Sequence, residues 1–247
     1  MNLAENRRLA TWPWGVILLV ALTFPTLITW VYFYAMAGSE TVRWIYSGSK
    51  VLQFSLLIPW YLYCRREAAQ TSNDASPSGW PKWKGIQAGV VFALAVVAIG
   101  VLLYVGVLRD SSLMTPAAEQ IRGKLADMGA ASPLGYLGLS VFLAGIHSLL
   151  EEGYWRWFVY GGLRQRMPVP LANGISSLGF MAHHFLVLAA FFPGQWTWIA
   201  VFSLAVAVGG AAWAWLYQRT GSLVGPWLSH LIVDAGILAI GYDLAFR

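Results

Sequence analysis

The chain has 247 residues, of which 58% are hydrophobic and only 11% are charged, and its net charge is +5. Soluble domains usually carry about 25% charged residues, so this composition excludes an ordinary soluble enzyme. The basic residues are spread over short polar connections and form no stripe, which excludes a nucleic-acid-binding protein. A single cysteine, Cys64, excludes an internal disulfide framework. We therefore expect an all-α polytopic membrane protein whose surroundings are the lipid bilayer.

Seven apolar segments are long enough to cross a bilayer, which takes about 20 helical residues. They are residues 13–37, 44–64, 86–108, 134–163, 171–192, 196–217 and 223–244. The first is longer than a signal-peptide core of roughly 7–15 residues, so we interpret it as a retained membrane helix. The fourth is too long for one upright helix. It could tilt, extend past the membrane surface or contain an eighth span, which gives about seven to eight membrane helices.

Two connections between these segments are long. Residues 65–84 are polar and rich in turn-forming residues, and they predict a flexible loop. Residues 110–133 contain good helix formers from Pro116 to Met128. We expect a short helix there, capped by Ser112 or Thr115 and ended by Gly129, which could lie on the membrane surface.

The basic residues of the connections predict the orientation in the membrane. Nine lie on the side of the N-terminus and five on the opposite side: Arg7, Arg8, Arg65, Arg66, Lys82, Lys84, Arg164, Arg166 and Arg219 against Arg43, Arg109, Arg122, Lys124 and Arg247. The excess predicts a cytoplasmic N-terminus and, with seven spans, an external C-terminus. An eighth span would reverse the predicted orientation of every segment that follows it. A short chain without a targeting segment also suggests a prokaryotic plasma membrane.

Charged and histidine side chains are concentrated in the last four apolar segments. The first three segments contain only Lys50, whereas the last four contain His147, Glu151, Glu152, Arg156, His183, His184, His230, Asp234 and Asp243. A charge at the bilayer centre costs roughly 2.5–3.5 kcal/mol, so such groups usually face a bundle interior and mark function. We therefore divide the chain into N-terminal membrane helices, residues 1–133, and a catalytic C-terminal helical bundle, residues 134–247.

Helical spacing separates the two adjacent glutamates. Residues four apart share a face, so Glu152 and Arg156 can form an ion pair. Glu151 lies about 100° around the helix from Glu152 and has no cation at that spacing, although His147 precedes it by one turn. This pattern makes Glu152 the structural partner and Glu151 the free carboxylate.

A free carboxylate and histidines from separate helices suit the activation of water. The carboxylate can act as a general base. Two imidazoles can hold a metal, or polarise a carbonyl group and stabilise an oxyanion. His230 and Asp234 share a helix face, so the carboxylate could orient the imidazole. The soluble zinc-peptidase pattern His-Glu-x-x-His is absent from the sequence.

Three motifs on three apolar segments resemble a known signature. Glu151-Glu152-x-x-x-Arg156, Phe180-x-x-x-His184 and His230-x-x-x-Asp234, in this order, are similar to the motifs of the CAAX-prenyl-protease and bacteriocin-processing family (CPBP, or Abi). The members of this family are intramembrane endopeptidases. The resemblance covers residues 134–245.

The resemblance implies a role for each motif residue. Glu151 with His184 would activate the attacking water. His230 and Asp234 would polarise the scissile carbonyl, stabilise the oxyanion or help to bind a metal. Glu152 and Arg156 would support the site, and Phe180 would shape the pocket beside His184. The family's third motif commonly ends in Asn, so Asp234 makes this site more acidic and favours a cation.

Metal and substrate follow from the same resemblance. A divalent metal, zinc by preference, would be held by Glu151, His184, His230 and Asp234. Two further histidines, His147 and His183, are assigned to support. The partner would be a membrane-associated peptide or protein, such as a prenylated CAAX segment, while the oligomeric state stays open.

Two other classes of function compete with an endopeptidase. A proton- or ion-coupled transporter could use the same buried Glu, His and Asp residues as a relay. It would favour paired repeats or helices broken at matching positions, and only Pro25 and Pro59 interrupt the first two segments. A non-catalytic scaffold that binds a membrane partner is the third possibility.

Overall fold

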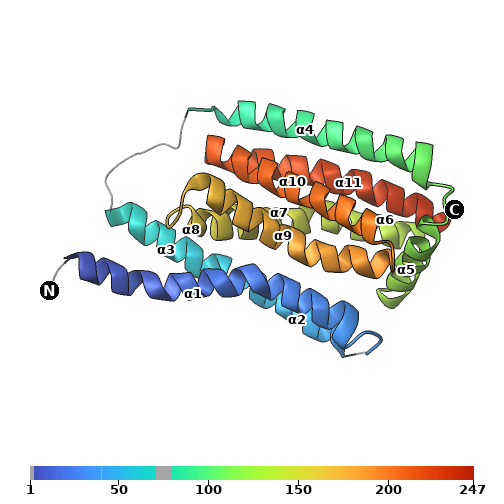
Figure 1. Ribbon diagram of the computed structural model, residues 1–247, viewed down its shortest axis with the longest axis horizontal. Coiled ribbons are helices and arrows are strands. Elements are labelled where there is room, and N and C mark those ends of the chain that lie inside the picture. The colour runs from blue at the N-terminus through green and yellow to red at the C-terminus, as the bar shows by residue number, and fades with distance from the viewer. Residues whose placement is uncertain (1–2, 40, 71–78) are drawn as a thin grey trace.

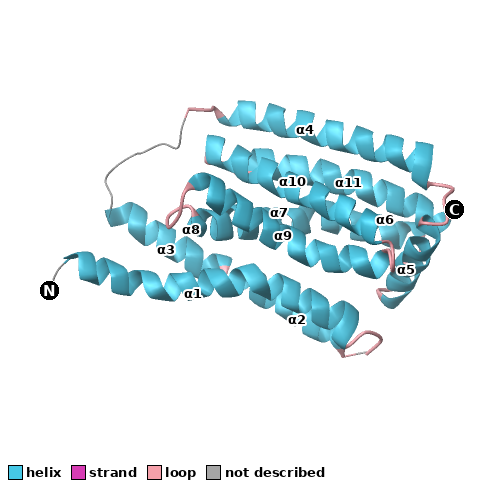
Figure 2. Ribbon diagram, in the orientation of Figure 1, coloured by secondary structure: helices cyan, strands magenta, loops and turns pink. Residues whose placement is uncertain are grey.

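The computed structural model describes residues 3–39, 41–70 and 79–247. Every regular element in this part of the chain is a helix (Figure 2). The predicted all-α class is therefore confirmed. Residues 71–78 of the predicted loop 65–84 lie outside the described residues, and the helices on its two sides extend to Gln70 and begin at Lys82.

The N-terminal half supplies three passes through the bundle. The elements are α1 (Leu3–Trp30) with η1 (Val31–Ala35), α2 (Val42–Ser55), α3 (Leu57–Gln70), and α4 (Lys82–Leu103) with η2 (Tyr104–Leu108). A shorter helix, α5 (Met114–Asp127), follows at the far end of the bundle (Figure 1).

The C-terminal half supplies four passes. The first is one long rod composed of α6 (Pro133–Val141), η3 (Phe142–His147), α7 (Ser148–Glu152), η4 (Gly153–Tyr160) and α8 (Gly161–Leu163). It is followed by α9 (Val169–Phe191), α10 (Trp196–Thr220) and α11 (Val224–Phe246). Successive passes alternate in direction, and the two termini lie at opposite ends of the bundle (Figure 1).

Six helices in the described residues are long and apolar enough to cross a membrane. The predicted second segment is the exception, because it is divided at Leu56 into α2 and α3, each of 14 residues. Pro59 explains the break: it has no N–H to donate to Ser55, and its ring crowds that carbonyl group. The predicted segment is thus a broken pass, and with it the described residues make seven passes.

The fourth predicted segment contains no eighth span. Pro133–Arg164 is continuous and spans 32 residues. Two stretches of it are π-helical, η3 and η4, and their i→i+5 hydrogen bonds place more residues in each turn than an α-helix does. The π-helical stretches therefore accommodate part of the extra residues of this segment without lengthening the helix in proportion.

The predicted short helix in residues 110–133 is confirmed as α5. Its C-terminus has the expected glycine: Gly129 has φ +67°, and the Ala130 N–H donates to the Leu125 carbonyl over 2.8 Å. The predicted cap at its start is wrong. The N-cap is Leu113, whose side chain cannot accept a hydrogen bond, so neither Ser112 nor Thr115 holds that position.

Helix α4 lies along α11, and α1 lies along α9 (Figure 1). Glycines permit the first of these contacts. A Cβ atom on Gly89 would lie 2.6 Å from the carbonyl oxygen of Gly225, which is too close for any side chain. Small residues at such crossings let membrane helices pack backbone against backbone.

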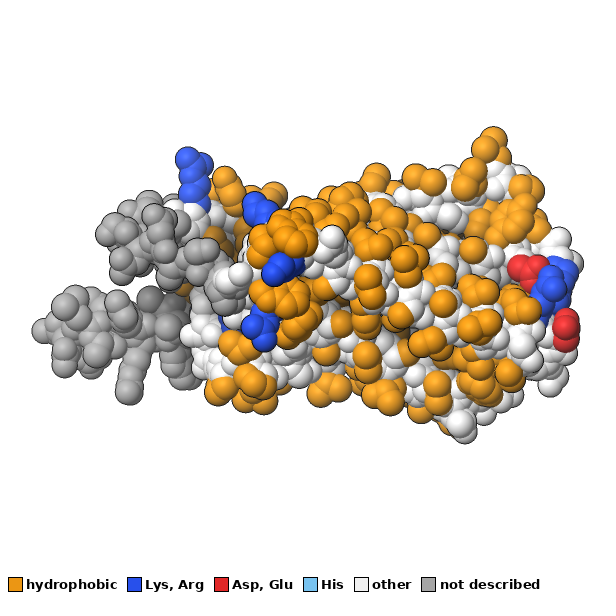
Figure 3. Space-filling model, turned by 90° about the horizontal axis from the view of Figure 1, so that it is seen from above, with side chains coloured by type: hydrophobic (Ala, Val, Ile, Leu, Met, Phe, Trp, Pro, Cys, Tyr) orange, Lys and Arg blue, Asp and Glu red, His pale blue; other side chains and the backbone are white. Residues whose placement is uncertain are grey.

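The surface seen in Figure 3 is hydrophobic along its middle, and charged side chains gather towards its two ends. The interior contains large aromatic side chains that are almost fully buried, among them Trp60, Tyr154, Trp155 and Phe158. An apolar outer belt with charged ends is the arrangement that a bilayer requires.

Candidate active site

The two glutamates lie in α7, a short α-helical stretch between the π-helical stretches η3 and η4. Neighbouring helices bind carbonyl groups of both stretches. Trp227 Nε1 on α11 donates to the Gly145 carbonyl over 3.0 Å, and Ser176 Oγ on α9 donates to the Trp155 carbonyl over 3.2 Å. These bonds fix the rotation of the rod and hence the directions in which the glutamates point. Single π turns inside helices are frequent at functional sites.

Glu152 is completely buried and paired. Its Oε1 lies 3.0 Å from Arg156 Nη1 and accepts a hydrogen bond from His230 Nδ1 over 2.8 Å. The guanidinium group of Arg156 also stacks between the rings of Phe180 and Trp213, 4.5 and 4.8 Å from their centroids. The predicted Glu152–Arg156 pair is therefore confirmed. The bond to His230, from another helix, was not predicted.

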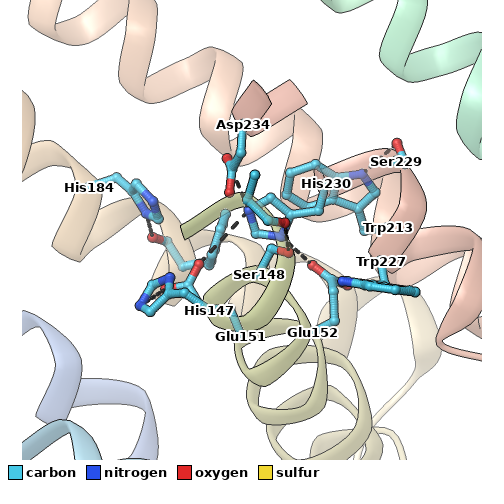
Figure 4. A network of polar contacts seen from close by, with 12 residues as sticks. His147, Ser148, Glu151, Glu152, His184, Trp213, Trp227, Ser229, His230 and Asp234 are labelled. Atoms are coloured by element: carbon cyan, nitrogen blue, oxygen red, sulfur yellow. Dashed lines mark hydrogen bonds and ion pairs between the residues drawn. The ribbon is translucent and has the colours of Figure 1, made fainter. Parts of the chain in front are cut away.

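Glu151 is also buried, but no side chain binds it closely. Three imidazole nitrogens surround its carboxylate: Nε2 of His147 at 3.9 Å, of His183 at 3.7 Å and of His230 at 3.9 Å. All three distances exceed that of a hydrogen bond. Figure 4 shows His147, Glu151 and His230 facing one another from separate elements. Glu151 is thus the less constrained of the two carboxylates, as its spacing predicted.

His230 connects the two glutamates. Its Nδ1 bonds to Glu152, which leaves Nε2 on the side of Glu151 and 3.5 Å from Asp234 Oδ1. The ring lies parallel to that of Trp213, with centroids 4.1 Å apart. The indole N–H of Trp213 in turn donates to Ser229 Oγ over 2.9 Å. The predicted proximity of His230 and Asp234 is found, but Glu152 rather than Asp234 holds the imidazole by a hydrogen bond.

The two adjacent histidines of α9 have different surroundings, and their order differs from the predicted one. His183, predicted to support the site, is buried and closest to Glu151, with its ring parallel to that of Trp155. His184 instead places Nδ1 2.9 Å from the Phe180 carbonyl of its own helix. Within the described residues no ion pair joins His184 to Glu151, so the predicted pairing of those two residues is not found. Phe180 does contact the ring of His184, with centroids 4.5 Å apart.

The reason for this difference is the rotation of α9. Neighbouring residues point about 100° apart on a helix, so two adjacent histidines approach Glu151 from different directions. Trp155 and Phe180 pack edge to face at 5.7 Å and set that rotation. The packing of large aromatic residues cannot be read from the Phe-x-x-x-His spacing.

The donor types around Glu151, carboxylate oxygens and imidazole nitrogens, are those that zinc prefers. Their arrangement does not provide a metal site: among the described residues, no three His, Cys, Asp or Glu side chains group together in a way that could hold an ion. We therefore derive no step through a metal. Zinc binding by Glu151, His184, His230 and Asp234 stays a prediction.

The comparisons with known proteins agree with the geometry of the site. Residues 132–236 match a family model described as type II CAAX prenyl endopeptidase Rce1-like. Comparison with curated proteins and with solved structures gives no match. The matched range contains all three motifs and the rod that carries the glutamates. Residues 132–236 of this integral membrane protein are therefore similar to the CAAX prenyl endopeptidases, as the sequence resemblance predicted.

Proposed function

We propose that the protein is a glutamate-dependent intramembrane endopeptidase that hydrolyses a peptide bond of a membrane-associated substrate. The observation that supports this best is the pair of adjacent glutamates with opposite surroundings. Glu152 is held by Arg156 and His230, whereas Glu151 is buried among three imidazoles without a hydrogen bond from any of them. A buried carboxylate that is not bound to a cation can accept a proton from water.

In the proposed reaction Glu151 takes a proton from a water molecule as its oxygen attacks the scissile carbonyl carbon. His183, whose Nε2 lies 3.7 Å from that carboxylate, orients the same water. The carbonyl double bond opens, and its electron pair moves onto the oxygen. The result is a tetrahedral intermediate that carries one negative charge.

His230 is placed to stabilise that charge. Its Nδ1–H is directed at Glu152, so Nε2, when protonated, can donate to the oxyanion. Asp234, 3.5 Å from Nε2, would favour that protonated ring. Glu151 then returns its proton to the departing amine nitrogen as the C–N bond breaks. The products are a carboxylic acid and an amine, and the enzyme regains its starting protonation state.

Of the features that a transporter would favour, the described residues contain one broken pass. Only α2–α3 is broken at a proline, while α1 continues through Pro25. The broken pass is not one of those that carry the three motifs. The rings of Trp155, Phe180 and Trp213 pack against His183, His184 and His230 respectively.

The proposal can be tested by cleavage of a farnesylated CAAX-type reporter peptide in proteoliposomes. Wild-type protein and the Glu151→Ala variant would each be assayed as prepared, with a chelator, and with added zinc. We expect the wild type to cleave the reporter and the variant to lose at least about 100-fold in rate. The chelator arm determines whether a metal takes part.

A failure of wild-type protein to cleave this or a bacteriocin-type leader peptide under every metal condition would contradict the proposal. Substrate-dependent ion flux in the same liposomes would then favour the transporter. Cleavage that survives in Glu151→Ala would show that the peptidase works through another residue.

A further inference from the structure

Helix α2 presents a lysine within the apolar part of the molecule. Lys50 Nζ donates to Gln53 Oε1 over 3.2 Å and lies above the rings of Tyr46 and Phe54, 5.5 and 5.9 Å from their centroids. No carboxylate of the described residues lies within 4.0 Å of this ammonium group. A membrane-embedded cation is expensive unless a partner compensates it, so the absence of a carboxylate partner needs an explanation.

A second donor lies beside Lys50. Gln53 is completely buried, and its Nε2 has no hydrogen-bond partner. Because its Oε1 accepts from Lys50, its amide N–H groups point away from that bond. A buried donor that is left unpaired costs about 1–3 kcal/mol. Lys50 and Gln53 are thus two neighbouring donors, one of them charged, and neither has an anionic acceptor.

This pair of donors is connected to the candidate active site through Phe54. The ring of Phe54, one turn after Lys50, packs edge to face against the ring of His147 at 5.9 Å. His147 lies 3.9 Å from Glu151, so the Phe54–His147 contact joins α2 to the surroundings of that carboxylate. Residues 42–55 lie outside the range that matches the family model. Their contribution to the site is therefore a feature of this chain's own N-terminal half.

We propose that Lys50 and Gln53 bind a carboxylate of the peptide substrate beside the scissile bond. The ammonium group would bind one carboxylate oxygen and the Gln53 amide the other, in charge-assisted and neutral hydrogen bonds respectively. The inference rests on the proposed peptidase function and adds a substrate preference to it. The carboxylate can come from a free C-terminus or from an acidic side chain, and the peptides of the test distinguish these sources.

The test measures binding rather than cleavage, in the Glu151→Gln background, where turnover is suppressed. Three dansyl-labelled farnesylated peptides of the same length serve as probes. One ends in a free carboxylate, one in a C-terminal amide, and one in an amide with an aspartate in its tail. Energy transfer from tryptophan to dansyl in detergent micelles gives each Kd.

The variants are Lys50→Met, Lys50→Arg and Gln53→Glu, with Lys124→Met as the matched control. Lys124 also lies over two aromatic rings, those of Tyr32 and Phe33, but it has a carboxylate partner, Asp127 at 4.0 Å. Gln53→Glu is nearly isosteric and places a carboxylate beside Lys50. It therefore tests the same idea if Lys50→Met does not fold.

We expect a peptide with a carboxylate to bind about tenfold or more tightly than the plain amide. Lys50→Met and Gln53→Glu should reduce this ratio to about one, Lys50→Arg should keep most of it, and Lys124→Met should not change it. The peptide that is preferred identifies the source of the carboxylate. Equal binding of all three peptides, or a ratio unchanged in Lys50→Met and Gln53→Glu, would overturn the inference.

A failure of this inference can be told apart from a failure of the proposed function. Selective binding without cleavage in the Glu151-containing protein would keep the carboxylate site and refute the peptidase. Cleavage without selective binding would support the peptidase and refute the carboxylate site.

Discussion

Helix α11 carries two clusters of charged residues that differ in how closely their members are paired. At its C-terminal end, Asp243 accepts two hydrogen bonds from Arg109, both of 3.0 Å, and one from the Tyr104 hydroxyl of 2.6 Å. Arg247 bonds to Asp110 over 3.1 Å and to the Arg109 carbonyl over 2.9 Å. This cluster is compact and partly exposed, and its close pairing holds the end of α11 to the segment after α4.

The cluster in the first half of α11 is more loosely joined. Of the contacts around Glu151 and the Nε2 atom of His230, none is shorter than 3.5 Å. Buried polar atoms without a hydrogen-bond partner remain on Glu152, Arg156 and His183. Native proteins seldom leave such groups unpaired, except where strain or catalysis has a use for them. The close pairing of the first cluster suits a role in stability, whereas the looser arrangement of the second suits the catalytic role that we propose for it.

The strongest way to break this comparison is to remove the guanidinium group that pairs with Glu152. Arg156→Met would leave the buried Glu152 with a single partner, His230. We expect a destabilisation of about 3–5 kcal/mol, because an uncompensated buried charge is costly. Thermal unfolding of the purified variant in detergent measures it.

A double variant provides the control for that result. Glu152→Gln combined with Arg156→Met removes both charges and should recover much of the lost stability. If the single variant is as stable as wild type, the pair is not the structural support that we describe.

The two histidines of α9 give the next largest expected effect. His183→Ala removes the imidazole closest to Glu151, and we expect reporter cleavage to fall about 100-fold. His184→Ala removes a ring whose Nδ1 is turned to the Phe180 carbonyl, and the fall should be smaller. Parallel kcat and KM measurements compare them. A larger loss of cleavage in His184→Ala than in His183→Ala would contradict this expectation. It would support the role that the Phe-x-x-x-His motif assigns to His184.

A smaller effect is expected from Asp234→Asn. The substitution keeps the shape of the side chain and yields the residue that is common in the family's third motif. Since Asp234 lies 3.5 Å from His230 and that ring donates its hydrogen bond to Glu152 instead, we expect less than about a tenfold loss in kcat. Complete loss of cleavage would make Asp234 an essential member of the site.

The smallest effect on catalysis should come from the closely paired cluster. Asp243→Asn would weaken the bonds to Arg109 and lower the unfolding midpoint by a few degrees, while reporter cleavage stays at the wild-type level. Unfolding and cleavage are measured on the same preparation. A large loss of cleavage here would remove the distinction between the two clusters.

The sequence predicted those features that depend on a single helix. Spacing alone identified the Glu152–Arg156 pair, the position of His147 beside Glu151 and that of Asp234 beside His230. Contacts between helices were not predictable in this way. The bond from His230 to Glu152 joins residues 78 apart, and the choice of His183 over His184 depends on how aromatic packing rotates α9.

Two further features of the fold follow from local backbone effects. Pro59 indicated an interruption of the second segment, which the structure places at Leu56. The π-helical stretches on both sides of α7 left no signal in the spacing, because they depend on Trp227 and Ser176 reaching the rod from α11 and α9. Lys50 was visible as an isolated charge, but its position near the site depends on how α2 packs.

The central claim is that the two adjacent glutamates have different tasks, and one experiment compares them directly. Glu151→Gln and Glu152→Gln would be purified in parallel, and each would be measured for reporter cleavage in proteoliposomes and for thermal unfolding. We predict that Glu151→Gln unfolds at the wild-type temperature with cleavage reduced about 1000-fold, and that Glu152→Gln unfolds at a clearly lower temperature. An active Glu151→Gln variant, or a Glu152→Gln variant as stable as wild type, would contradict the account.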